Sequence, residues 1–197
     1  GGFTAAGNTT MSSNTASGDG GAVYVSGGNI EISGATSVLT LSSNNAVNGG
    51  AFYVNNGSIT TSAIQKAIIN NNYSAAVAGT GGEGGAFYVS NGNINMCKTD
   101  LSGNGKLGDS VKTTNGGAIA LYNGVFSFAD GSEIKNNAAT GNGGGLYVSS
   151  ATAKTIKCIG GSYLANSSAL GGGIYASGPI DLTIAANVRG NAAVNGG

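Results

Sequence analysis

The stretch LSSNNAVNGGAFYV, residues 41–54, decides the fold. It joins two short motifs. The first places an apolar residue three positions before an asparagine (Leu41 and Asn44), and the second places a small residue and a strand-like run after a glycine pair (Gly49 to Val54). Both motifs recur in alternation, with glycine pairs opening coils near residues 20, 49, 84, 116, 143 and 171. A segment of roughly 30 residues cannot bury a core alone, so the repeat indicates a solenoid whose coils pack on one another.

Each coil contains three short runs in which apolar and polar residues alternate at period two, the pattern of a strand with one buried face. The first run follows the glycine pair, the second comes a few residues later, and the third ends in the asparagine motif. We therefore predict an all-β fold: a single-stranded parallel β-helix of about six to seven three-strand coils, right-handed as parallel connections usually are. It would cover residues 1–197 as one segment of a longer repetitive chain.

Aligning the coils predicts inward columns of apolar side chains. The first run is expected to supply Val23, Phe52, Phe87, Ile119, Leu146 and Ile174. The second run is expected to supply Ile30, Ile59, Ile94, Phe126, Ile156 and Leu182. The apolar residues of the asparagine motif are Met11, Leu41, Ile68, Leu101, Ile134, Tyr163 and Val188.

The asparagine of that motif is expected to form a structural column at one corner of the solenoid. Asparagine tolerates left-handed turns and can hydrogen-bond along a stack, which would satisfy backbone groups where the strand bends. The glycine pairs would form another corner, where positive φ and close approach of coils are needed. The predicted column is Asn14, Asn44, Asn71, Asn104, Asn137, Asn166 and Asn191.

The two cysteines fall on different coils in this register. Cys158 lies in an inward column, whereas Cys97 follows the inward Met96 and should point outward. Two coils correspond to roughly 10 Å along the axis, beyond the ~7 Å that a disulfide spans. We predict that both thiols are free.

Composition excludes several functions. The chain has no His, a single Arg and a formal net charge of zero, so Ser-His-Asp sites, imidazole metal ligands and a basic nucleic-acid surface are excluded. Its apolar runs are too short for a transmembrane helix. Of the eight acids only Asp130 and Glu133 are near neighbours, and a turn explains both. We predict no catalytic residues, no cofactor and no metal site.

The alternation of Gly-Gly-Ala plus an apolar residue with apolar-x-x-Asn resembles the passenger repeat of the chlamydial polymorphic membrane proteins, which are autotransporters. The close matches are Gly20 to Val23, Gly49 to Phe52, Gly84 to Phe87 and Gly116 to Ile119. The phenylalanine that is usual before x-x-Asn in that family is replaced in all seven copies here. The resemblance implies a secreted, surface-displayed adhesin segment, associated with the outer membrane, that contacts host cells or other copies of itself.

One outward column offers a candidate binding face, and it consists of tyrosines interrupted by Ala120: Tyr24, Tyr53, Tyr88, Tyr147 and Tyr175. Stacked rings either hold a glycan or a protein partner or stabilise the sheet without any ligand. The longest insertions, residues 72–83 and 105–115, leave the coil after the asparagine corner. Solenoids often carry binding loops at such an edge, although simple loop tolerance explains the insertions equally well.

Three functions compete on the sequence alone. The first is an adhesin stalk that contacts a host or neighbouring cell surface through protein or glycan. The second is a structural fibre or surface-layer subunit, in which bare coil ends stack head to tail on other copies. A polysaccharide-active β-helix enzyme is a distant third, because its clustered carboxylates are missing from the sequence pattern.

Overall fold

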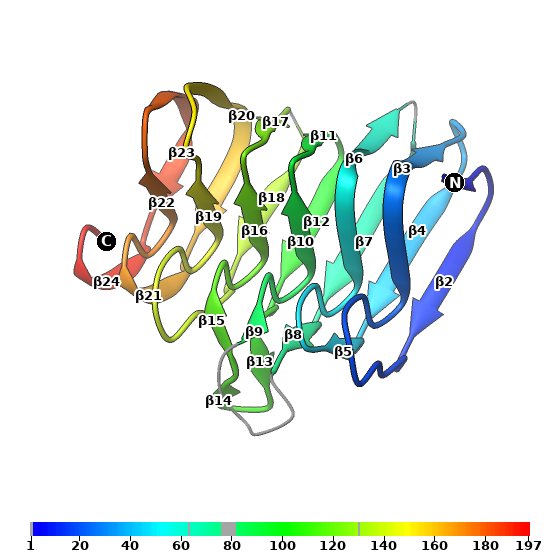
Figure 1. Cartoon of the computed structure of the whole chain (residues 1–197), viewed down its shortest axis with the longest axis horizontal. Helices are drawn as coiled ribbons and strands as arrows, with labels where there is room; N and C mark the ends of the chain where they lie inside the picture. The colour runs from blue at the N-terminus through cyan, green and yellow to red at the C-terminus, as the bar shows by residue number, and fades with distance from the viewer. Residues whose placement is uncertain (1, 63, 76–81, 130) are drawn as a thin grey trace.

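The alternating runs build parallel strands that wind into a solenoid (Figure 1). The computed structural model describes residues 2–62, 64–75, 82–129 and 131–197, and these contain strands and turns but no helix. They therefore contain no helix that could serve as a membrane span. Successive coils make about six turns and follow one another along the long axis from the N-terminus to the C-terminus. The predicted all-β parallel solenoid is confirmed.

Three faces run along the solenoid, and the first begins after each glycine pair. It contains β3 (Val23–Ser33), β6 (Phe52–Ser62), β10 (Phe87–Ser90), β16 (Ile119–Tyr122), β19 (Leu146–Ser149) and β22 (Ile174–Ser177). All neighbours pair in parallel, and the register joins Val23, Phe52, Phe87, Ile119, Leu146 and Ile174. This is the predicted first inward column, and it is confirmed.

The second face uses the later halves of β3 and β6. Its other strands are β1 (Phe3–Ala5), β11 (Asn93–Met96), β17 (Val125–Phe128), β20 (Lys154–Leu164) and β23 (Ile180–Arg189). The predicted second column is also confirmed, because the register joins Ile30, Ile59, Ile94, Phe126, Ile156 and Leu182.

The third face leads into the asparagine corner. It contains β2 (Thr9–Ser12), β4 (Val38–Ser42), β7 (Lys66–Asn70), β12 (Thr99–Ser102), β18 (Glu133–Lys135) and the ends of β20 and β23. One assignment in this column was wrong: Ile69, not Ile68, pairs with Leu41 and Leu101. Ile69 is fully buried, whereas Ile68 faces outward beside Thr40 and Asp100.

Short strands connect the third face to the next glycine pair. They are β5 (Asn45–Ala46), β8 (Tyr73–Ser74), β9 (Gly82–Glu83), β15 (Thr113–Asn115), β21 (Ser167–Leu170) and β24 (Ala192–Asn195). Along this edge the antiparallel hairpin of β13 (Lys106–Leu107) and β14 (Ser110–Val111) projects beyond the coils (Figure 1). The hairpin is the structure adopted by the predicted insertion at 105–115.

The core fills the solenoid from end to end with the inward columns. Phe52 and Phe87 stack with ring centroids 5.4 Å apart, and Phe128 packs against Tyr163 at 5.9 Å. Burial is complete in the middle coils but not in the last described coil, where Leu182 and Ile184 are 39% and 47% exposed. Cys158 is buried in this core, Cys97 lies at its margin, and both thiols are free.

The glycine pairs set the distance between coils at one corner. The first glycine of the third full pair, Gly84, has φ +66°, and the second, Gly85, lies directly over the next coil. A Cβ on Gly85 would come 2.0 Å from the carbonyl oxygen of Gly117. No side chain fits there, so this glycine is required by coil stacking itself.

Replacing Gly85 with alanine should therefore push two coils apart, whereas the same change at Gly18 should be harmless because nothing lies within 4 Å of its Cβ position. We expect Gly85→Ala to lower the free energy of unfolding by about 3 kcal/mol or more, and Gly18→Ala to change it by less than about 0.5 kcal/mol. Urea unfolding followed by circular dichroism measures both. Equal stability of the two variants would show that the coils are not packed at this distance.

Candidate functional site

A ladder of asparagine side chains runs through the corner that follows the third face. In its centre, Oδ1 of Asn72 accepts hydrogen bonds from the backbone N–H of Asn44 and from Nδ2 of Asn44, both at 2.9 Å. Nδ2 of Asn72 in turn donates to Oδ1 of Asn104 at 3.0 Å and to the carbonyl of Leu41 at 3.1 Å. The same pattern links the whole ladder: Asn14, Asn44, Asn72, Asn104, Asn137, Asn166 and Asn191.

The structure corrects one member of the predicted column, because Asn71 is replaced by Asn72. Asn71 is exposed and has φ +54°, and it belongs to a separate column of left-handed corner residues that precedes the ladder. That column, not the ladder, carries the positive φ values: Ser13, Ser43, Asn71, Gly103, Asn136, Ala165 and Gly190. The sequence signal was ambiguous because Ile68-Ile69 is followed by three consecutive asparagines.

The ladder is a structural element with no capacity left for a ligand. From Asn44 to Asn166 its side chains are fully buried, and their amides are used within the stack and on strand carbonyls. Buried amides are stabilising only when they are paired in this way.

The five predicted tyrosines lie on the outer side of the first face, and a sixth completes their stack. Tyr24 to Tyr53 and Tyr53 to Tyr88 have centroids 5.0 Å apart and nearly parallel rings, and Tyr147 stacks on Tyr175 at 5.5 Å. Tyr122, which the sequence analysis missed, bridges Tyr88 and Tyr147 at 5.4 and 5.6 Å.

Tyr122 reaches the gap because it lies two residues after Ala120 on β16, and alternate residues of a strand share one face. Ala120 pairs with Tyr88 and Tyr147 and is fully buried. The hydroxyl of Tyr122 donates to Oε2 of Glu83 at 2.5 Å. Tyr122 could have been found in the sequence by looking for an aromatic residue two positions after Ala120, the small residue that interrupts the tyrosine column.

A second polar row runs beside the tyrosines, immediately before the glycine pairs. Nδ2 of Asn48 donates to Oδ1 of Asp19 at 3.0 Å, and the N–H of Glu83 donates to Oδ1 of Asn48 at 3.1 Å. Nδ2 of Asn115 then donates to Oε1 of Glu83 at 2.7 Å. The row thus places two carboxylates along the edge of the tyrosine stack.

Burial and these carboxylates disfavour ionisation of the two central phenols, Tyr88 and Tyr122. Burial raises the pKa of Tyr88 to about 12, with smaller contributions from Tyr53, Glu83 and Asp19. Burial and then the hydrogen bond to Glu83 raise the pKa of Tyr122 well above its ordinary value. The hydroxyl groups of Tyr88 and Tyr122 therefore stay neutral well above physiological pH.

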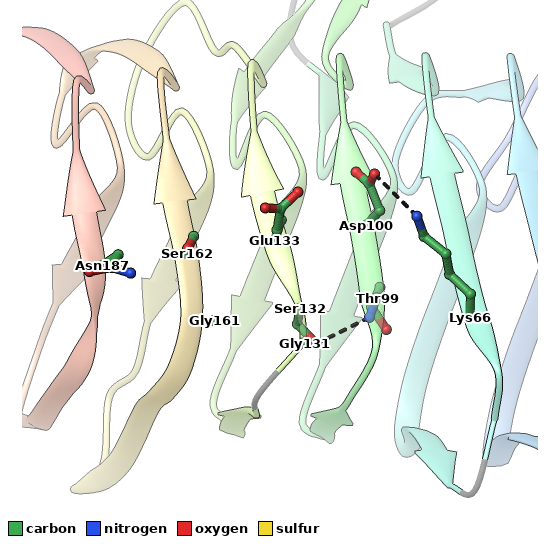
Figure 2. Close-up of a pocket in the computed structure, with 9 residues that line it drawn as sticks. All are labelled: Lys66, Thr99, Asp100, Gly131, Ser132, Glu133, Gly161, Ser162 and Asn187. Atoms are coloured by element: carbon green, nitrogen blue, oxygen red, sulfur yellow. Dashed lines mark hydrogen bonds and ion pairs between the residues drawn. The ribbon is translucent and has the colours of Figure 1, made fainter.

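A shallow groove of about 380 Å³ crosses the outer side of the third face (Figure 2). Asp100, Glu133, Ser162 and Asn187 lie side by side there because their strands pair in register. The full lining is Lys66, Thr99, Asp100, Gly131, Ser132, Glu133, Gly161, Ser162 and Asn187.

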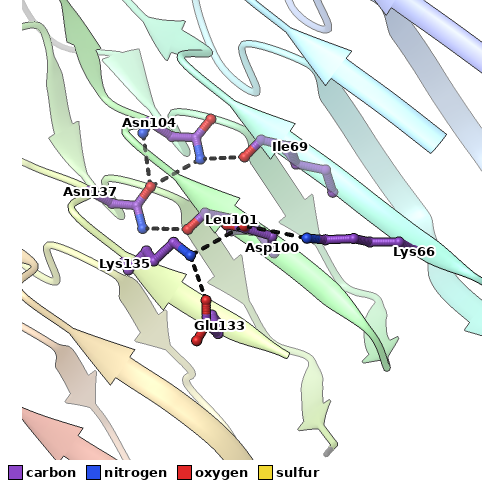
Figure 3. A network of polar contacts seen from close by, with 8 residues as sticks. All are labelled: Lys66, Ile69, Asp100, Leu101, Asn104, Glu133, Lys135 and Asn137. Carbon is purple, nitrogen blue, oxygen red and sulfur yellow. Dashed lines mark hydrogen bonds and ion pairs between the residues drawn. The ribbon is translucent and has the colours of Figure 1, made fainter. Parts of the chain in front are cut away.

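Lysines neutralise the two carboxylates of this groove (Figure 3). Nζ of Lys135 lies 3.2 Å from Oδ2 of Asp100 and 2.5 Å from Oε2 of Glu133, and Lys66 lies 4.0 Å from Asp100. The hydrogen bond to Glu133, and then Asp100, raises the pKa of Lys135. The cross-strand repulsion of Asp100 and Glu133 is thereby offset.

The sequence analysis missed the Asp100–Glu133 pair, since it compared only neighbours along the chain. Each acid stands one residue before the apolar residue of the asparagine motif, so aligning the coils would have shown it. Asp130, the predicted neighbour of Glu133, lies outside the described residues. Within the described ranges, no group of three or more His, Cys, Asp or Glu residues is arranged to hold a metal ion.

Comparison with known proteins supports the repeat. Residues 8–26 match the family model described as Chlamydia polymorphic membrane protein repeat. The matched stretch contains Met11 and Asn14 of the first asparagine motif and the glycine pair Gly20-Gly21. The resemblance to that repeat is therefore shown at this position, and the same ladder and glycine geometry continue in the later coils. Neither the curated proteins nor the solved structures gave a match.

Neighbouring asparagines offer a direct test of the ladder. Asn72→Ala leaves the buried backbone N–H of Asn44 without its acceptor and removes the bond to the carbonyl of Leu41, so the free energy of unfolding should fall by about 2 to 4 kcal/mol. Asn71→Gly keeps the left-handed backbone and should change it by less than about 0.5 kcal/mol. Thermal and urea unfolding measure both, and a larger loss at position 71 would restore the original assignment.

Alkaline pH should weaken the fold through the tyrosine stack. Because the folded state holds the pKa of Tyr88 and Tyr122 above the ordinary 10.0, the contribution of the neutral phenols is complete below pH 10 and is lost as pH rises toward 12. The free energy of unfolding should fall over this window, and less steeply in Tyr88→Phe. Urea titrations at several pH values give the slopes, and identical slopes for both proteins would contradict the assignment.

Proposed function

We propose that the chain is a segment of a surface-displayed passenger protein, exposed at the outer membrane of its cell, that acts as an adhesin. The observation that carries the proposal is the polymorphic membrane protein repeat at residues 8–26, which lies near the start of the parallel solenoid. The buried ladder and core make this solenoid a rod. A rod of this kind suits the display of binding surfaces at a distance from a membrane.

The tyrosine stack supports contact with another surface. Its rings follow one another along the first face, and Tyr24 at one end is 55% exposed. Tyrosine supplies a large amphipathic contact area with little loss of side-chain entropy, so it is frequent at protein contacts and against sugar rings. The neighbouring carboxylates of Asp19 and Glu83 add acceptors for hydroxyl or amide groups.

A structural fibre, in which copies stack end to end, is the second candidate. Ile184 and Val188 of β23 are 47% and 43% exposed on the last described coil. Phe3 and Met11 of the first coil are only partly buried against the core. A further coil in the spacing of the solenoid, from the same chain or from a second copy, would cover each set, and a fibre requires that the second copy supplies it.

Adhesion is tested with beads that carry the purified chain. We expect saturable binding to cultured epithelial cells that the soluble chain competes away. Binding no greater than that of albumin-coated beads would contradict the proposal. The double variant Tyr53→Ser, Tyr88→Ser, checked for folding by its melting temperature, then reports whether the stack makes the contact.

Light scattering over a range of protein concentrations separates the two candidates. A stable monomer that binds cells supports the adhesin. Filaments that lengthen with protein concentration support the fibre, provided that the variant Ile184→Glu, which introduces a charge on the last described coil, prevents them.

A further inference from the structure

A pocket of about 550 Å³ lies at the base of the inserted hairpin, and its lining shares no residue with the tyrosine stack or with the third-face groove. It is lined by Ser43, Asn71, Tyr73, Gly103, Lys106, Gly108 and Asn136. These residues come from four consecutive coils and from β13 and the turn of the hairpin. The neighbouring coils of the solenoid carry no such hairpin among the described residues.

The floor of the pocket is the column of left-handed corner residues. Ser43, Asn71, Gly103 and Asn136 have φ values of +55°, +54°, +64° and +56°. Gly103 is the one position of these four without a side chain, and a Cβ there would lie 2.7 Å from Oδ1 of Asn71. The missing side chain lets the amide of Asn71 lie over Gly103, and the pocket opens beside it.

The walls of the pocket are held by the backbone of the hairpin. The N–H groups of Lys112 and Thr113 both donate to the carbonyl of Gly105, at 2.8 and 3.2 Å, which closes the hairpin base. Lys106 follows directly and is half-buried, and so is Tyr73 on the opposite connection. Tyr73 and Lys106, an aromatic and a cationic residue, therefore line the same pocket.

The polar side chains of the pocket are available to a ligand. Among the described residues, the side chains of Ser43, Asn71, Lys106 and Asn136 have no hydrogen-bond or ion-pair partner. Of the residues that the structure describes, no acidic one lines the pocket, and Asp109 on the hairpin turn is exposed and outside the lining. The pocket thus offers one uncompensated positive charge, neutral amides and a hydroxyl.

We propose that this pocket binds a pyranose that carries an acidic substituent, a carboxylate or a sulfate. The ring of Tyr73 packs against the C–H face of the sugar, because a tyrosine ring offers an apolar face together with a polar hydroxyl group. The amides of Asn71 and Asn136 and the hydroxyl of Ser43 pair with sugar hydroxyls. Lys106 pairs with the acidic group. The volume falls within the range of pockets for small ligands.

This inference deepens the proposed function by naming a ligand class for the adhesin, and it rests on that function for its biological meaning. Its test uses purified protein and free sugar. A failure of cell adhesion therefore leaves the titration result standing, and a failure of the titration leaves adhesion through the tyrosine stack open to its own test.

The experiment is a titration followed by two-dimensional NMR, in which methyl β-D-glucuronide is compared with methyl β-D-glucoside. We expect the glucuronide to shift the side-chain amide signals of Asn71 and Asn136 with a Kd on the order of 1 mM, as suits a ligand of this size. The uncharged glucoside, and the Lys106→Gln variant with the glucuronide, should bind about two- to fivefold more weakly.

A matched pair of glycine variants locates the site. Gly103→Asn introduces a residue that its corner column already accepts, but its Cβ would lie 2.7 Å from Oδ1 of Asn71. The new side chain therefore displaces that amide and should weaken binding about tenfold or more. Gly190→Asn makes the same change at a corner with φ +62° and no atom closer than 4.0 Å to its Cβ position, outside the pocket, and should leave binding unchanged.

Two further probes distinguish the source of the acidic group. N-acetylglucosamine 6-sulfate binding more tightly than the glucuronide assigns a sulfated glycan, and the reverse order assigns a uronic acid; either supports the proposal. Glucoside binding as tight as glucuronide, inorganic sulfate binding as tight as either acidic sugar, or unchanged binding in Gly103→Asn would each overturn it.

Discussion

The corner after the third face imposes the constraint on which the rest of the structure depends. There the chain leaves one strand and turns toward the next glycine pair, and its backbone N–H groups would be buried without partners. Asn72 shows how these groups are paired. Its Oδ1 accepts a hydrogen bond from the backbone N–H of Asn44 one coil earlier, and its Nδ2 donates one to the carbonyl of Leu41. Each asparagine thereby fixes the register of the coil beside it. Every inward column and the tyrosine stack follow from that register.

A solenoid locked in this way uses nearly all of its distinctive residues for its own stacking. The ladder asparagines are buried, and the second glycine of a pair such as Gly85 has no room even for a methyl group. Function is therefore left to what faces outward or departs from the coil. The tyrosine stack is an outward column, the third-face groove holds charges that neutralise one another, and the hairpin pocket is built by an insertion. Candidate binding sites distributed along a rod in this way suit contact with extended partners.

The sequence predicted the coils and two complete inward columns because each coil repeats the same alternation, for example at Phe52 and Phe87. It failed where several registers satisfy the pattern equally: Ile68-Ile69 and the three asparagines that follow permit either Asn71 or Asn72 in the ladder. Burial decides between them, and burial is a property of the packed coil. Tyr122 was missed because its ring leans over Ala120 from two residues away. The hairpin pocket depends on how the inserted hairpin lies against the corner residues of four coils, which no motif records.

Hydrogen exchange of the ladder amides tests this account most directly. The backbone N–H groups of Asn44, Asn72 and Asn104 each donate to the asparagine of the next coil. We expect them to exchange as slowly as the N–H of Phe87 in the core strand β10, because they should open only when the coils separate. Exchange at the rate of an unstructured peptide, with Phe87 still protected, would show that the ladder does not hold the coils together.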